Sequence, residues 1–346
     1  MENRDRIILD GMGGDNAPGA VVEGAALASR LIENPICIVG DEAKLAAELA
    51  RHKCDPKKIE LVHAEEAISG DEAPVRAVRT KQRSSIVVGM NMLKNGEGGV
   101  FVSAGNTGAL MAGGLFILGR IRGIDRPAIA STYPILGKGV SLLVDTGANA
   151  ECKPNNLLEF AMMGSIYMEK VLNKKNPTVG LVNMGTEENK GTTVLKAAHA
   201  LLARNRDTKG GVRFVGNIEA RDIPHGAVDV VVCDGYVGNV ILKLTEGLAW
   251  SIFRLIRQKF MSGLLPKMGA LLLSGKLSEL RDAFDYSEYG GAPILGVRGA
   301  LVKMHGSSNA KAVKNAIVKT LPYMKNEVVR HIESAILDLE VTGSLE

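Results

Sequence analysis

The sequence predicts an α/β protein built on a mostly parallel, doubly wound sheet, and two observations support this prediction. Short apolar runs alternate with helical patterns almost from the first residues. Most of these runs are continuously apolar, which is typical of strands that helices cover on both faces. The β-α-β rhythm implies right-handed crossovers, and ligands of such sheets bind beyond the carboxyl ends of the strands.

The apolar runs give the expected strands, which are 6–10, 36–40, 59–63, 99–104, 128–132, 140–145, 178–183, 213–217, 229–234, 293–297 and 300–306. Helical patterns lie between many of them, as in PGAVVEGAALASRLI, EAKLAAELARH and KGTTVLKAAHALLARN, and SSNAKAVKNAIVKTL begins the closing helices. We expect a single α/β domain over residues 1–346.

Composition narrows the class of protein. Of the 346 residues, 46% are hydrophobic and 23% charged, as in a soluble globular protein with a sizeable core. A net charge of +4 is too small to imply nucleic-acid binding. The N-terminus lacks the apolar stretch of a signal peptide, and no window reaches the ~20 apolar residues of a membrane span. We therefore expect a cytoplasmic protein whose cysteines are free thiols, namely Cys37, Cys54, Cys152 and Cys233.

Glycine-containing turns with Asp, Asn, Thr or Lys follow several expected strands. They read DGMGGDNAP, SAGNTGA, VDTGANAECKP, VNMGTEENKGTT, VGNIEARDIP and CDGYVGNVILK. Any one of them could simply cap a helix or form a turn. Together they predict a shared ligand site, because backbone N–H groups and helix N-termini suit an anion.

Several familiar motifs are incomplete. GMGGDN has Asn16 where a dinucleotide-binding loop needs its last glycine, and Lys190-Gly191-Thr192 reverses the order of a phosphate-binding loop. No nucleophile elbow, metal-binding helix or histidine pair with metal-ligand spacing is present. An enzyme of this sequence would gather polar groups around an anion and position a second substrate beside it, without a metal or cofactor.

The stretch from 247 to about 282 interrupts the β-α rhythm. Its part up to residue 278 has apolar residues near helical spacing, five basic residues and no acidic one. Pro266 and the flanking glycines predict a helix–turn–helix break. A basic amphipathic pair of helices could form a dimer surface, touch a membrane or dock an acidic partner. An ordinary core helix with solvated lysines is the alternative.

The ordered set DGMGGDNAP, SAGNTGA, VDTGAN, GTEENKG, CDGYVGNV and HGSSN resembles the PlsX-type phosphate acyltransferase family of bacterial phospholipid synthesis, from residue 6 to about 340. The resemblance implies a three-layer α/β/α sandwich related to phosphotransacetylases and isocitrate-dehydrogenase-like enzymes. It also implies a homodimer with two long projecting helices. The expected reaction transfers an acyl group from acyl carrier protein to inorganic phosphate. The acyl phosphate then passes to a membrane glycerol-3-phosphate acyltransferase, and the enzyme associates peripherally with the membrane.

The resemblance and the chemistry of the turns suggest the site residues. Lys190 and Lys243 are candidates for a cationic clamp on phosphate, with Asn239 as a third catalytic group. Lys190 could also be a solvated lysine, and Asn239 a helix cap. The remaining phosphate- or substrate-binding candidates are Gly13, Gly14, Asp15, Asn106, Thr107, Asn217, Asp234, Gly235 and His305.

Carboxylates facing phosphate would repel it. We therefore expect the aspartates at strand ends to orient lysines and asparagines or to cap helices; these are Asp10, Asp15, Asp145 and Asp234. His305 could donate to phosphate or bond to a turn.

Acyl carrier protein is acidic, so basic residues should steer its approach. The candidates for contact with carrier protein or membrane are Arg254, Arg257, Lys259, Leu264, Leu265 and Lys267. Two rival functions are a short-chain phosphotransacetylase that uses acyl-coenzyme A and a non-catalytic scaffold of lipid synthesis. A dehydrogenase is weakened by the incomplete dinucleotide-binding loop.

Overall fold

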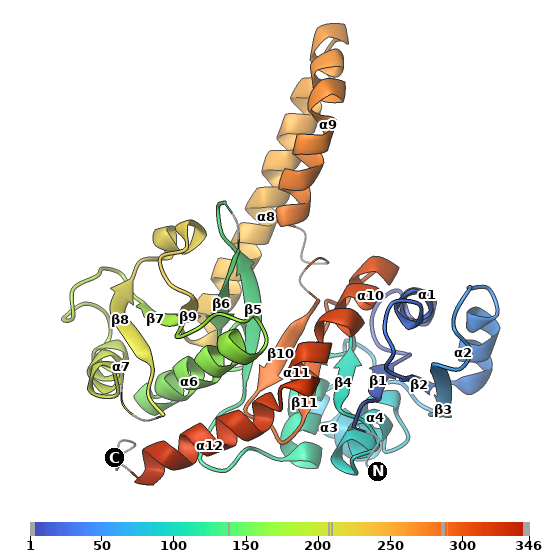
Figure 1. The fold of residues 1–346 in the computed structure, drawn as a ribbon, viewed down its shortest axis with the longest axis horizontal. Helices are drawn as coiled ribbons and strands as arrows, with labels where there is room; N and C mark the ends of the chain where they lie inside the picture. The colour runs from blue at the N-terminus through green and yellow to red at the C-terminus, as the bar shows by residue number, and fades with distance from the viewer. Residues whose placement is uncertain are drawn as a thin grey trace.

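An eleven-stranded sheet runs through the whole molecule in the computed structural model (Figure 1). The structure describes residues 4–137, 139–206, 208, 210–284, 288 and 290–341. The ends of the predicted domain, 1–3 and 342–346, lie outside these residues. The cysteines predicted to be free thiols are free, and they are Cys37, Cys54, Cys152 and Cys233.

Each strand falls on a segment predicted to be one. The strands are β1 (Ile7–Asp10), β2 (Ile36–Gly40), β3 (Ile59–His63), β4 (Val100–Ser103), β5 (Ala128–Pro134), β6 (Val140–Val144), β7 (Thr178–Val182), β8 (Arg213–Ile218), β9 (Val230–Val232), β10 (Ala292–Leu295) and β11 (Ala300–Lys303). Four of them, β1, β2, β4 and β9, are buried along their whole length, which explains their continuous apolar character.

The order of strands is β3-β2-β1-β4-β11-β10-β5-β6-β9-β7-β8. Pairing is parallel on both sides of the centre, but β11 with β10, β10 with β5 and β5 with β6 pair antiparallel. The prediction of a mostly parallel sheet is confirmed. Because the two parallel halves run in opposite directions, however, their carboxyl ends do not share one edge.

Helices cover both faces of the sheet, so the three-layer sandwich is confirmed. One buried apolar cluster joins the first face to α1 (Gly19–Ser29), α2 (Glu42–Leu49), α6 (Pro154–Lys170), α7 (Thr193–Arg204), α10 (Ala310–Lys319), α11 (Leu321–Lys325) and α12 (Val328–Val341). Two further clusters join the second face to α3 (Pro74–Thr80), α4 (Ser85–Lys94), α5 (Thr107–Gly113), the π-helix η1 (Gly114–Leu118), the 3-10 helix η2 (Ala220–His225) and the start of α8 (Gly235–Phe260).

Polar side chains begin many of these helices. The side chain of each capping residue accepts a hydrogen bond from the backbone N–H three residues further on, which contributes about 1 kcal/mol per cap. The capping residues are Asp41, Ser84, Asn106, Thr192, Asp234 and Asn309. Four of these caps belong to turns that the sequence singled out, so part of their polar character serves the fold.

Two long helices project from the body, as predicted (Figure 1). They are α8 and α9 (Leu264–Ala283), and the break between them covers residues 261–263, with Pro266 in the first turn of α9. Of α8, the first turns pack on the body, where Val237 and Ile241 join its core. We call residues 247–283 the arm. None of the described helices is both long enough and apolar enough to cross a membrane.

Candidate active site

A cavity of about 420 Å³ lies over the antiparallel centre of the sheet, between the start of α5 and the first turns of α8. Five predicted site residues line it, namely Thr107, Gly235, Asn239, Lys243 and His305. Its other lining residues include Ile129, Ser131, Thr132, Thr146, Tyr236, Leu242, Glu246, Lys303, Met304 and Ala312. Turns from both halves of the sheet therefore line the cavity. These turns face one another across the centre of the sheet.

The turn after β6 fixes where α8 begins. The buried Asp145 carboxylate accepts hydrogen bonds from the backbone N–H groups of Ile129 at 3.0 Å and Asn149 at 2.7 Å. The N–H of Gly235 donates to the Asn149 carbonyl at 2.7 Å. A Cβ on Gly238 would lie 1.9 Å from the Asp145 carbonyl oxygen, so only glycine allows this approach. Asp145 therefore holds the backbone of this turn, and it also orients an asparagine, as expected of an aspartate at a strand end, because the Asn149 amide donates to it at 3.0 Å.

The close packing of α8 presents Asn239 and Lys243 to the cavity. Among the described residues, the Asn239 amide and the hydroxyl of Thr107 have no hydrogen-bond partner and are free to bind a ligand. Lys243 forms an ion pair with Glu246, one turn further along α8, at 2.8 Å. Asp234 does not face the ligand space with its carboxylate, because it caps α8 by accepting from the N–H of Val237 at 2.8 Å.

Lys303 is a cavity residue that the sequence analysis missed. It ends β11, is half-buried, and its ammonium group donates to the Met304 carbonyl. Burial lowers the pKa of Lys303 to about 8, an effect that the charge of Asp15 opposes and that of Lys243 reinforces. The signal was present in ALVKMHG, where one lysine interrupts an otherwise apolar strand.

His305 stands beside Lys303 at the same wall of the cavity. Its Nδ1 lies 2.8 Å from the Ser307 hydroxyl, so the ring is held by its own turn. Burial lowers the pKa of His305, and the positive charge of Lys243 adds to the effect. A neutral imidazole that can donate one hydrogen bond is the expected form near neutral pH.

The glycine turn after β1 lies behind this wall and does not line the cavity. The N–H of Asp15 donates to the Gly306 carbonyl at 2.8 Å. A Cβ on Gly13 would lie 2.3 Å from a carboxylate oxygen of Asp10, and Gly14 has a φ of +100°. Gly13, Gly14 and Asp15 therefore hold the turn that carries His305 in place.

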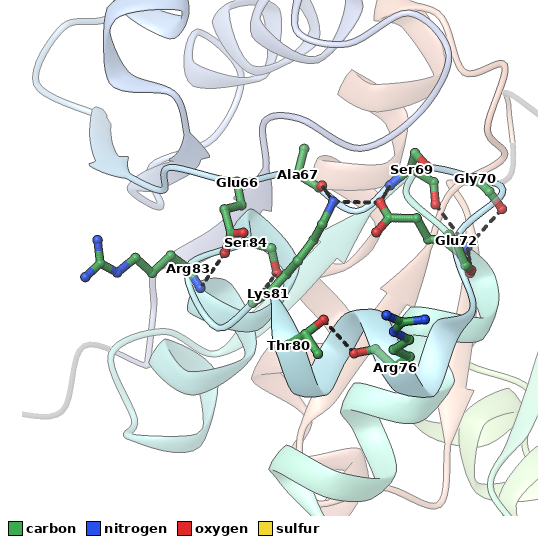
Figure 2. Close-up of polar contacts among 11 residues, drawn as sticks. Glu66, Ala67, Ser69, Gly70, Glu72, Arg76, Thr80, Lys81, Arg83 and Ser84 are labelled. Atoms are coloured by element: carbon green, nitrogen blue, oxygen red, sulfur yellow. Dashed lines mark hydrogen bonds and ion pairs between the residues drawn. The ribbon is translucent and has the colours of Figure 1, made fainter.

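Both ends of the Asn106 amide form hydrogen bonds with the protein backbone. Its oxygen caps α5, and its nitrogen donates to the carbonyls of Ser69, Gly70 and Glu72. Figure 2 shows the same loop folded against α3, where Lys81 donates to the Ala67 carbonyl at 2.9 Å and pairs with Glu72 at 2.8 Å. This fastening sets the position of Thr107, the next residue in the chain, at the cavity.

Lys190 and Asn217 do not line the cavity that contains Lys243. Asn217 donates to the Glu187 carbonyl at 2.8 Å and bonds to His199 at 3.1 Å, so its amide holds the turn after β7. Lys190 is 46% exposed and lies 3.6 Å from Glu187. In this arrangement, Lys243 shares the cavity with Lys303 and not with Lys190. No group of His, Cys, Asp and Glu among the described residues is arranged to hold a metal ion.

Comparison with known proteins identifies the family to which this chain belongs. A family model described as "Fatty acid synthesis protein" matches residues 6–331. The phosphate acyltransferase of Alkaliphilus oremlandii is 50% identical over 334 residues, covering 96% of this chain and 98% of that protein. The phosphate acyltransferase of Clostridioides difficile is 46% identical, covering 96% of each.

Solved structures show the fold class. The EutD phosphotransacetylase from Staphylococcus aureus matches with a TM-score of 0.59 and 16% identity, over 93% of this chain and 95% of that one. A phosphotransacetylase from Streptococcus pyogenes matches with a TM-score of 0.61 and 14% identity, over 98% and 95% of the two chains. At this identity the likeness concerns the fold alone. The match to the family model and the near-full-length relatives show that the chain belongs to the phosphate acyltransferase family of fatty acid synthesis proteins.

Proposed function

We propose that this enzyme transfers a fatty acyl group from the thioester of acyl carrier protein to inorganic phosphate, giving acyl phosphate and free carrier protein. The observation that supports this most strongly is the composition of the cavity wall. Lys243 and Lys303 supply positive charge beside the free donors of Thr107 and Asn239. Apolar side chains, including Ile129, Leu242 and Ala312, share the same space. Phosphate suits the polar part, and the start of an acyl chain suits the apolar part.

The proposed reaction needs no nucleophile from the protein. A phosphate oxygen attacks the thioester carbonyl carbon, the new C–O bond forms, and the C–S bond breaks with its electron pair on sulfur. The thiolate leaves and takes a proton from solvent; an ordinary thiol has a pKa of about 8.5, so this step is easy. Two serine and threonine hydroxyls at the cavity already bond within the protein. The hydroxyls of Ser131 and Thr146 bond to each other at 2.9 Å, and the Thr146 hydroxyl also donates to the Ile129 carbonyl.

Positioning and charge compensation are the tasks left to the protein. The lysines would hold phosphate within ~3 Å of the carbonyl carbon, which removes most of the entropic barrier to attack. The amide of Asn239, which lines the cavity, would donate to the carbonyl oxygen as it becomes negative. Lys190 remains a predicted phosphate contact, and it would have to approach the cavity when substrate binds.

The surface of the arm is consistent with two proposed partners, a second copy of the chain and acyl carrier protein. Its apolar side chains are exposed, which argues against the alternative of an ordinary core helix; examples are Leu248 at 56%, Trp250 at 68% and Leu272 at 87%. We propose that a second copy of the chain covers part of this surface in a homodimer. The basic residues Arg254 and Arg257 would attract the acidic carrier protein.

The tip of the arm fits a lipid surface. Leu264 and Leu265 are 82% and 81% exposed next to the break between α8 and α9, and Lys259 and Lys267 flank them. This combination is typical of peripheral binding to anionic membranes. Such contact would let a cytoplasmic enzyme deliver acyl phosphate, a poorly soluble product, to a membrane glycerol-3-phosphate acyltransferase.

Turnover on defined thioesters tests the proposal. We expect palmitoyl-acyl carrier protein to release free carrier protein only when phosphate is present, with acyl phosphate trapped as the hydroxamate. Consumption of acetyl-coenzyme A in place of the carrier-protein thioester would identify a short-chain phosphotransacetylase. Release that does not depend on phosphate would rule out the proposed reaction.

A further inference from the structure

Two lysines line the cavity, but they differ in how their charges are balanced. Lys243 lies on α8 and is paired with Glu246 at 2.8 Å. Lys303 lies on β11 and forms no ion pair with an acidic side chain of the described residues. Its ammonium group donates a hydrogen bond to the Met304 carbonyl. Of the two cations, Lys303 is thus the one without an ion-pair partner among the residues that the structure describes.

A half-buried ammonium group without a counter-ion is unfavourable. Removing a charge from water carries a penalty that a nearby opposite charge must offset. The charges of Asp15 and Asp10 act on Lys303 from behind the cavity wall, yet burial and the charge of Lys243 outweigh them, and the pKa of the ammonium group is lowered to about 8. The folded protein therefore keeps an under-compensated cation at a cavity, which is how an anion-binding group is expected to look before its ligand arrives.

The geometry points to Lys303 as the principal contact for the attacking phosphate, in an anion subsite formed with His305 and Thr107 at the end of β11. This inference rests on the proposed function, and it assigns to Lys303 the charge-compensating role that the motifs had suggested for Lys190. Lys243, whose side chain is 51% exposed and already paired with Glu246, assists from the side of α8.

The neighbouring backbone fits such a subsite. Lys303 pairs in register with Ala292 of β10 and Ser103 of β4, so the sheet holds its Cα firmly. Gly290 and Gly291 line the same cavity with φ values of +83° and +94°, and they leave this part of the wall without side chains. A small, highly charged ligand can approach Lys303 there.

Binding and kinetics of three variants test the inference. Lys303→Met removes the charge and keeps most of the length of the side chain, whereas Lys303→Arg retains the charge. Lys58→Met is the matched control, because Lys58 is also little exposed but pairs with Glu33 far from the cavity. We expect Lys303→Met to raise the KM for phosphate about 10- to 100-fold, the range of one charge-assisted hydrogen bond, with little change in the KM for palmitoyl-acyl carrier protein.

The other two variants define the specificity of the effect. Lys303→Arg should recover most of the phosphate affinity, and Lys58→Met should match the wild type. An unchanged phosphate KM in Lys303→Met would overturn the inference. An equal rise in the KM of both substrates would also overturn it, because that pattern indicates general damage to the site.

Lysine labelling of the unmodified enzyme makes the inference independent of variant folding and of turnover. Reductive methylation followed by mass spectrometry should show that inorganic phosphate protects Lys303 and leaves Lys58 equally reactive. Equal labelling of Lys303 with and without phosphate contradicts the subsite. If phosphate protects Lys303 but no acyl phosphate forms, the subsite stands and the proposed function fails, so the two claims are separable.

Discussion

At the scale of single residues, Lys303 ties the chemistry of the cavity to pH. Burial lowers the pKa of this lysine from 10.5 to about 8, so the free enzyme carries the charge below about pH 8 and loses it above. We therefore expect phosphate affinity to fall as the pH rises through 8. The measurement is the phosphate KM between pH 7 and 9.5 in the wild type and in Lys303→Arg, which remains charged throughout.

The comparison of the wild type with Lys303→Arg also has to account for the other charged and titratable groups that face Lys303. Asp10 and Asp15 act from the β1 turn, Lys243 from α8 and His305 from the turn after β11. Phosphate itself and all four of these groups are common to the wild type and the arginine variant. A fall in affinity of the same size in both proteins would therefore contradict the assignment to Lys303.

How far the site could be predicted also depends on individual residues. Thr107, Asn239 and Lys243 were found because they follow glycine-containing turns that end strands. Asn106 and Asn217 come from similar turns, but their amides bind backbone carbonyls, and only the tertiary fold shows which amides are occupied in this way. Lys303 was not predicted as a site residue because it belongs to a strand and to no polar turn.

At the scale of elements, the packing at the start of α8 positions the side chains that this helix contributes to the site. A methyl group at Gly238 would collide with the Asp145 carbonyl, whereas Gly247, further along the same helix, has nothing within 4 Å. We expect Gly238→Ala to destabilise the protein by about 2 kcal/mol or more and to reduce turnover, because Asn239 and Lys243 move with the helix. Gly247→Ala should be neutral or stabilise by up to about 1 kcal/mol. Urea unfolding and steady-state assays of both variants make the comparison, and equal behaviour would contradict it.

A buried carboxylate on α6 gives a second prediction at this scale. Glu159 is 3% exposed and accepts from the N–H groups of Asp125 and Arg126, and burial raises its pKa from 4.5 to about 7. Between these values the folded state binds its proton more tightly than the unfolded state, so this group lowers stability as the pH rises from 4.5 to 7.

Glu159→Gln keeps an acceptor oxygen without the charge. It should therefore raise the free energy of unfolding by about 2 kcal/mol at pH 7.5 and change it little at pH 4.5. Urea titrations at the two pH values provide the measurement. A loss of stability at pH 7.5 would mean that the carboxylate charge itself supports the contact between α6 and the loop before β5.

Elements were easier to predict than their directions. Buried strands are continuously apolar, so the sequence marked each of them. The reversal in the centre of the sheet was readable in principle, because the predicted segments 128–132 and 140–145 are joined by only 133–139, and a parallel crossover needs about a dozen residues or more. That short connection makes β5 and β6 a hairpin and turns the second half of the sheet around.

At the scale of the whole molecule, the arm separates surface contacts from chemistry. Leu264 and Leu265 begin α9 beside the far end of α8, whereas the residues of α8 that line the cavity lie in its first turns. The two helices project together from the body (Figure 1). We expect the double change Leu264→Asp and Leu265→Asp to weaken binding to anionic liposomes at least 10-fold, because two buried leucines contribute about 3 kcal/mol or more. Turnover of palmitoyl-acyl carrier protein in solution should remain.

Leu31→Asp is the matched control, because Leu31 is 65% exposed on the body of the protein. Sedimentation with liposomes of anionic and neutral lipid compares the three proteins. Equal liposome binding by the wild type and the tip variant would remove the membrane role of the arm and leave its apolar surface to the homodimer.

The fate of the phosphorus atom distinguishes acyl transfer to phosphate from hydrolysis of the thioester. In a single-turnover reaction of enzyme, palmitoyl-acyl carrier protein and inorganic phosphate, ³¹P NMR should show a new acyl phosphate resonance that grows in step with free carrier-protein thiol. Lys303→Met should slow that growth at low phosphate and recover at high phosphate. Release of carrier protein with free fatty acid and no new phosphorus signal would contradict the account, because water and not phosphate would then be the acyl acceptor.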